Sequence, residues 1–162
     1  MTLDNLYNAY LGELYGISFF TTFVEQYSDR SHNNKWQALL DIELITAQKL
    51  KLALQPLGME CPDYDAEMAQ KGITDANKWL HLSWPILIDT MVTWVAPYQQ
   101  RYQQQADNAQ QHQALYTLVA DHENTIYDFL LAEQAGSTKS LQILQCFLDK
   151  HCKQQSADLK SN

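Results

Sequence analysis

Residues 113–136 read QALYTLVADHENTIYDFLLAEQAG, and apolar residues recur in this stretch every three or four positions. This spacing is typical of an α-helix with one buried face, and Gly136 after the last turn is a common residue at a helix end. The apolar positions of that face are Leu115, Leu118, Val119, Ile126, Phe129 and Leu130. His122 lies in the middle of the same face, so the stretch predicts a helix that carries an imidazole into the core.

Three other segments have the same period and also predict long helices. Glycine and proline are scarce in the chain, which favours long helices over a turn-rich β fold. Besides 113–134, the predicted helices are 3–27, 34–56 and one that begins at Ser83, contains Pro97 and runs into the glutamine-rich segment 99–113. We therefore expect an all-α protein, built as an antiparallel up-down four-helix bundle.

A long connection, residues 57–82, separates the second predicted helix from the third. We expect it to cross between two helical hairpins and to hold one or two short helical turns, around residues 66–70 and 75–80. A short fifth helix is expected to begin near Ser137, whose side chain suits a helix start. The cross-over and the fifth helix complete the predicted fold.

Length and charge limit the kind of protein this is. The 162 residues fit a single domain over 1–152, followed by a tail, 153–162, that is predicted to be disordered. A net charge of −8 argues against nucleic acid and anionic lipid as partners, and no apolar stretch predicts a membrane span. Without a secretory signal or CxxC spacing, Cys61, Cys146 and Cys152 fit free thiols in the cytoplasm.

Three ionisable residues lie where the helical period places core residues. Seven residues are close to two helical turns, so we count seven positions from the first inward residue of each predicted helix. The count relates four pairs of residues: Leu6 to Glu13, Trp36 to Glu43, Leu115 to His122 and Trp84 to Met91. The central layer of the bundle is therefore expected to contain two carboxylates, one imidazole and one thioether.

A carboxylate that is buried alone is costly, so it has to be paired, protonated or bound to a cation. Carboxylates and imidazoles are ordinary ligands of iron, manganese and zinc, and bundle cores often hold such sites. We therefore predict one iron, manganese or zinc ion bound by Glu13, Glu43 and His122. Glu123, at the edge of the same helix face, is a candidate fourth ligand. The alternatives are a metal-free, hydrogen-bonded Glu–His–Glu cluster, and a glutamate that reaches solvent at a helix edge.

Two more ionisable residues have no assigned role. Glu133 returns to the buried face three turns after His122. His81 lies shortly before Trp84 and is a candidate to approach the core from the cross-over. The histidines expected to be solvated are His32, His112 and His151.

Three motifs along the chain resemble the ferritin-like superfamily, which includes rubrerythrins and bacterial di-iron carboxylate proteins. They are LxxxYLGELYGxxFF from Leu6, WxxLLxIE from Trp36 and ADHExxIYDFLLAEQAG from Ala120. More narrowly, the pattern is similar to a set of uncharacterised bacterial proteins of that fold, over about residues 3–150. The resemblance implies a ferritin-like bundle with a carboxylate and histidine metal site in its core.

The chain departs from the di-iron pattern of that superfamily. A di-iron member carries Glu-x-x-His on two helices and a glutamate on the third. Here the residue three places after Glu43 is Thr46. The residue three places after Glu123 is Ile126, and the third helix offers Met91. The resemblance therefore implies a degenerate di-iron site that holds a single metal ion or none.

Three functions stay open on the sequence alone. The first is a ferritin-like protein that binds one metal ion; if it is an enzyme, its reaction is redox or metal-assisted hydrolysis. The second is a non-enzymatic interaction protein, a homodimer, in which the buried Glu–His cluster is structural. The third is a bundle that binds a small apolar molecule near Tyr98, Tyr102 and Tyr116.

Overall fold

A computed structural model describes the backbone of residues 2–160 and the side chains of residues 3–152. Within these residues all regular structure is helical, which confirms the all-α prediction. The α-helices are α1 (Thr2–Gln26), α2 (Asn33–Leu54), α3 (Ala66–Trp79), α4 (Trp84–Asn108), α5 (Gln113–Gln134) and α6 (Ser140–Lys160). Two 3₁₀ turns, Arg30–His32 and Gln55–Leu57, flank α2.

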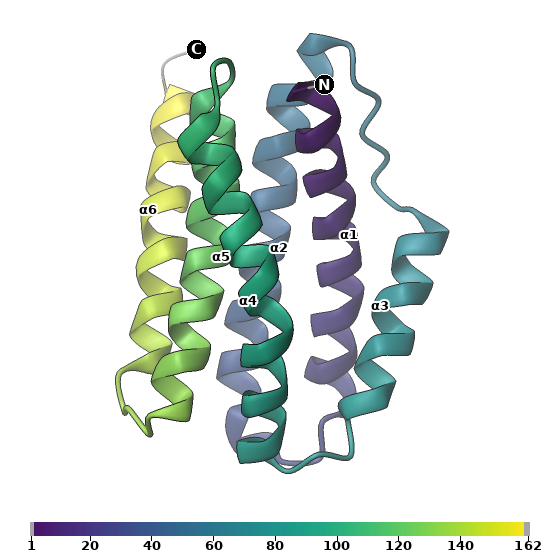
Figure 1. Cartoon of the computed structure of the whole chain (residues 1–162), viewed down its shortest axis with the longest axis vertical. Helices are drawn as coiled ribbons and strands as arrows, with labels where there is room; N and C mark the ends of the chain where they lie inside the picture. The colour runs from purple at the N-terminus through teal and green to yellow at the C-terminus, as the bar shows by residue number, and fades with distance from the viewer. Residues whose placement is uncertain (1, 161–162) are drawn as a thin grey trace.

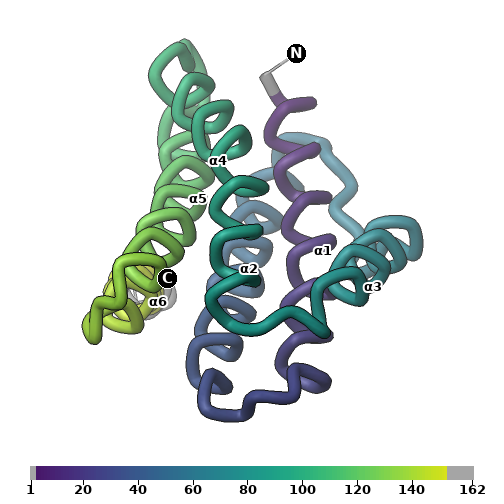
Figure 2. The backbone as a smooth tube through the Cα atoms, turned by 60° about the horizontal axis from the view of Figure 1, so that its bottom comes forward, coloured from purple at the N-terminus to yellow at the C-terminus, as the bar shows by residue number. Residues whose placement is uncertain are grey.

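Successive helices run in opposite directions, and α1, α2, α4, α5 and α6 follow the long axis of the molecule (Figure 1). In the packing, α1 contacts α2, α4 contacts α5, and α6 contacts both α2 and α5. The helix α3 lies on the outside of α1, as the second direction of view also shows (Figure 2). No helix within the described residues is both long and apolar enough to cross a bilayer.

The hydrophobic core has two parts, one towards each end of the bundle. The first includes Phe23, Trp36 and Phe129, and the second includes Leu6 and Leu50, all fully or almost fully buried. On α1, α2 and α5 the boundary between the two parts falls close to the predicted polar residues, because the two clusters use different turns of each helix. The ionisable residues therefore form a layer between two apolar regions.

The helix α3 is one continuous element of 14 residues, where the sequence predicted only short turns. Asp65 caps it, since its carboxylate accepts a hydrogen bond from the backbone N–H of Met68 at 2.9 Å. Gly72 lets it pack closely on α1, because a Cβ there would lie 2.5 Å from the backbone oxygen of Tyr15. Gly72 is thus the residue that allows the helix to dock.

The other helix ends agree with the sequence apart from the last one. Ser83 is the N-cap residue of α4, Pro97 lies inside that helix, and α5 ends just before Gly136. The fifth predicted helix was expected to be short, but α6 has 21 residues. The predicted tail, 153–162, is helical as far as Lys160, and its last two residues lie outside the described part of the chain. The longer α6 covers both α2 and α5.

Glu133 joins four helices at one end of the bundle. Its carboxylate lies 2.6 Å from Lys35 Nζ of α2 and accepts hydrogen bonds from Trp84 of α4 at 2.9 Å and from Ser140 of α6 at 2.5 Å. Burial disfavours the charged carboxylate, but these three donors outweigh it and lower the pKa of Glu133. Glu133 therefore has a structural role.

We expect Glu133→Gln to lower the free energy of unfolding by about 1–3 kcal/mol near neutral pH, because a charged acceptor of three bonds is lost. Because folding lowers the pKa of Glu133, the charged carboxylate stabilises the fold at pH values above its ordinary pKa of 4.5. This stabilisation is lost as the pH falls through the lowered pKa. Urea unfolding of both proteins across this range should show the difference shrinking in acid. Glu25→Gln, at an exposed site, is the control; equal losses in the two variants would contradict the role of Glu133.

Candidate metal centre

Three helices bring the predicted ligands together. Glu13 projects from the middle of α1, Glu43 from α2 and His122 from α5, and these residues are only 4%, 6% and 1% exposed. Each offers a ligand atom, and these atoms lie within 4.8 Å of one another. The helical period thus placed three residues, distant in sequence, at one buried point.

The contacts within this group are short ion-pair contacts whose geometry is not that of ordinary hydrogen bonds. His122 Nδ1 lies 2.9 Å from Glu13 Oε1, and His122 Nε2 lies 3.3 Å from Glu43 Oε1. Neither ring nitrogen is oriented for a hydrogen bond within the described part of the chain, and Glu13 Oε2 has no partner there either. Buried polar atoms are nearly always satisfied, so these three atoms call for an explanation.

The charges in the group act strongly on one another. Burial raises the pKa of Glu13 well above its ordinary value, and the neighbouring Glu43 adds to this effect. For His122 burial disfavours the imidazolium, but the negative charges of Glu13 and Glu43 outweigh it and raise the pKa well above its ordinary value. The group therefore attracts positive charge, either as protons or as a cation.

A glycine on α1 makes room for one of the carboxylates. A Cβ at Gly16 would lie 2.5 Å from the carboxyl carbon of Glu43, closer than atoms can approach without moving. At Gly12, one turn earlier on the same helix, the nearest atom to a Cβ would be the Tyr102 hydroxyl oxygen at 3.9 Å, an ordinary contact. Gly16 thus fixes where the Glu43 carboxylate can lie, whereas Gly12 does not.

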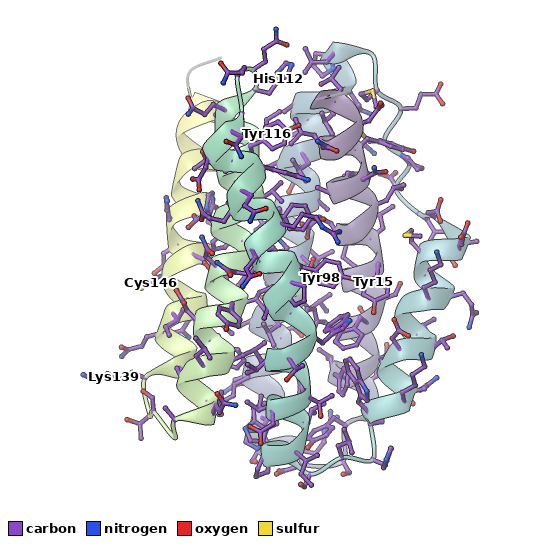
Figure 3. The ribbon with its side chains drawn as sticks, viewed as in Figure 1. Tyr15, Tyr98, His112, Tyr116, Lys139 and Cys146 are labelled. Atoms are coloured by element: carbon purple, nitrogen blue, oxygen red, sulfur yellow. The ribbon has the colours of Figure 1, made fainter. Side chains whose placement is uncertain are left out.

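A cavity of about 480 Å³ lies beside the group, between α1 and α4. Glu13 and Glu43 form part of its inner wall, and α3 and α5 contribute residues at its sides. The labelled Tyr15 on α1 and Tyr98 on α4, which both line it, mark its position in Figure 3. The volume is in the range of small-molecule sites, so water and small ligands have room next to the buried carboxylates.

Glu123 lines this cavity and does not belong to the group of three. It follows His122 directly on α5, and its side chain is partly exposed towards the cavity. Burial is the main reason why the pKa of Glu123 is raised to about 7, with the nearby His122 opposing the shift. Glu123 is therefore an acid of the cavity wall.

The structure also places the remaining predicted residues. His151, which was expected to be solvated, is instead buried, with Nε2 3.2 Å from Asp121. Tyr98 and Tyr102 line the cavity, whereas Tyr116 is buried in the core and does not. His81 is exposed in the turn between α3 and α4 and does not join the group. Met91 is fully buried in the core, as the count of seven predicted.

The sequence predicted a small-molecule pocket near Tyr98, Tyr102 and Tyr116, between the third and fourth predicted helices; the cavity is lined by Tyr98 and Tyr102 but lies between α1 and α4. One signal in the sequence was not used, namely the pair Gly12 and Gly16, which lie four residues apart on α1 and both line the cavity. Glycine inside a helix is unfavourable by about 1 kcal/mol relative to alanine, so two on one face indicate a place where space is needed.

No protein-family model matches this chain, and searches of curated proteins and of solved structures found no similar protein. The resemblance to the ferritin-like superfamily therefore stays a prediction, and the chemistry of the site follows from its own residues.

In metal-free protein we expect the pKa of the His122 imidazole to lie above its ordinary value of 6.5. Glu43→Gln should lower this pKa, because it removes one of the two neighbouring carboxylates. A raised histidine pKa means that the stabilisation by His122 is fully present below about 6.5 and is lost as pH rises through the higher value. Two-dimensional ¹H–¹⁵N spectra of the imidazole groups measure the pKa directly. The exposed His81 provides a reference signal that should be the same in both proteins. An unchanged His122 titration in the variant would contradict the interpretation.

Proposed function

We propose that this protein binds a single divalent metal ion, iron, manganese or zinc, through Glu13, Glu43 and His122. The observation that carries the proposal is the buried convergence of these three ligand groups without hydrogen-bond geometry between them. Two carboxylates and one imidazole form a donor set that suits these metals. A divalent ion also balances two carboxylate charges in a place where isolated charges are costly.

The contact distances support this proposal. Metal–ligand bonds to nitrogen and carboxylate oxygen are about 2.0–2.2 Å, so ligand atoms on one ion lie about 3–3.5 Å apart. Only one of the two ring nitrogens can bind the ion, so one of the two distances, 2.9 Å from Nδ1 to Glu13 or 3.3 Å from Nε2 to Glu43, is a distance between ligand atoms, and either one is of this size. The nitrogen that binds the ion then need not point at the carboxylate oxygen beside it. With one ring nitrogen on the ion, the other stays close to a carboxylate, as is common for ligating histidines.

The position of the group suggests more than a structural ion. Catalytic metal sites typically use three protein ligands and leave a position for water or substrate, whereas structural zinc sites are closed by four. Here three residues form the group, and Glu13 and Glu43 border a cavity. The antiparallel helix order and the long connection from α2 to α4 support a degenerate ferritin-like bundle as the setting.

The main test is metal content. Protein purified without a tag should contain about one ion per chain, and Glu43→Gln and His122→Gln should each weaken metal binding more than about 100-fold, since even changes next to a ligand cost 10–100-fold. Elemental analysis and titration of metal-free protein with Zn²⁺, Mn²⁺ and Fe²⁺ give both numbers. Glu123→Gln should keep the metal, because Glu123 lies outside the group.

The competing interpretation is a structural Glu–His–Glu cluster in a homodimeric interaction protein. It predicts no stoichiometric metal in the wild type and a melting temperature that chelators do not change. Such a result would overturn the metal proposal and leave the cluster as a feature of the fold.

Gly16→Ala gives a second and subtler prediction. The added methyl group would displace the Glu43 carboxylate, so we expect zinc affinity to fall at least about tenfold although no ligand is replaced. Gly12→Ala is the matched control, because its methyl group meets no atom closer than 3.9 Å. Both changes gain helix propensity, so a difference between them reports on Glu43 rather than on α1. Equal zinc affinities in competition with a fluorescent chelator would contradict this account.

A further inference from the structure

The cavity between α1 and α4 contains one acid that the metal group does not use. Glu123 lines the cavity and has no hydrogen-bond or ion-pair partner among the described residues. A partly buried carboxylate without a partner is unfavourable unless something supplies a positive charge or hydrogen bonds. The same wall includes Glu13, which is 4% exposed and whose Oε2 atom has no partner.

The acidic groups of this wall outnumber the positive charges that face them. A divalent ion on Glu13, Glu43 and His122 neutralises the two carboxylates of that group and leaves Glu123 as the uncompensated one. In the metal-free protein His122 faces the carboxyl groups of Glu13 and Glu43, and Glu123 lies outside these contacts. In both states the inner wall thus favours a positively charged group in the cavity.

Aromatic rings form much of the rest of the lining. They come from both sides of the cavity and include Tyr15, Trp94, Tyr98 and Tyr102. The hydroxyl group of Tyr15 donates to Asp75 at 2.6 Å, which holds its ring in place. The faces of such rings attract organic cations, and recognition of ammonium groups by several aromatic residues is a common use of this attraction.

We propose that the cavity binds an organic ammonium ion, with the nitrogen at Glu123 and the apolar body against the aromatic lining. This goes beyond metal binding and does not require it, because Glu123 is separate from the three ligand groups. A ligand with one ammonium group and a ring or short chain fits a space of about 480 Å³.

Two basic residues also border the cavity and provide the opposing argument. Arg101 and Lys71 are both exposed at its edge, where solvent screens their charges. Lys71 is paired with Glu67 at 3.1 Å, and the Arg101 guanidinium lies over the ring of Tyr98. If these residues dominated, the cavity would select an anion, so the test has to compare a cation with an anion of the same shape.

Three probes share one ring and differ in charge: benzylamine, benzyl alcohol and benzoate. Calorimetric titration of the full chain, in metal-free and zinc-loaded form, should show benzylamine binding at least about tenfold more tightly than the other two. Glu123→Gln should remove this preference by weakening benzylamine at least about tenfold. Glu60→Gln, exposed and outside the cavity, should bind as the wild type does.

A second variant tests the location independently of charge. Gly12→Phe places a ring in the cavity, where an added Cβ has room, so it should block benzylamine and leave zinc binding intact. Melting curves confirm that both variants are folded. Stronger binding of benzoate than of benzylamine, or equal benzylamine binding by wild type, Glu123→Gln and Gly12→Phe, would overturn the proposal.

The outcomes also separate this proposal from metal binding. His122→Gln, which changes a metal-group residue outside the cavity lining, should still bind benzylamine, and Glu123→Gln without amine binding should still hold zinc. A wild type that binds benzylamine but no metal would refute only the metal proposal, whereas one that holds zinc but does not discriminate among the probes would refute only the ammonium site.

Discussion

The burial of two carboxylates and one imidazole between two apolar regions is the constraint on which the rest of the structure depends. Removing such groups from water is costly, and their mutual attraction compensates only where the geometry is accurate. Glu13, Glu43 and His122 come from α1, α2 and α5, so these three helices must keep a fixed register. The apolar clusters above and below supply that register, because they lock each helix on both sides of the polar layer.

The same constraint explains an otherwise unfavourable feature of α1. Two glycines, Gly12 and Gly16, lie within a long helix where alanine would be more stable. Gly16 leaves the space that the Glu43 carboxylate occupies, and both glycines help to keep a cavity open towards α4. The two glycines thus make α1 less stable as a helix where the polar layer meets the cavity. Such a local loss of stability is more typical of a binding site than of a purely structural cluster.

Much of the polar layer could be predicted from the sequence because its geometry depends on a local rule. Residues seven apart on a helix face nearly the same direction, so the inward Leu6, Trp36 and Leu115 lead to the three candidate ligand residues. The long connection between α2 and α4 could also be predicted from the sequence. The continuous helix α3 was not, because Gly72 lowers helix propensity locally and its reason, close packing on α1, exists only in the folded chain.

The cavity and the place of Glu123 show where the local rule ends. A helical wheel gives the direction of a side chain but not the distance between two helices, so no count along the chain could predict the space between α1 and α4. For Glu123 the helical rotation per residue explains the position that the structure shows. Neighbouring residues on a helix differ in direction by about 100°, so a residue next to the inward His122 cannot converge on the same point. It turns instead to the adjacent space, which is why Glu123 lines the cavity and stays outside the ligand group.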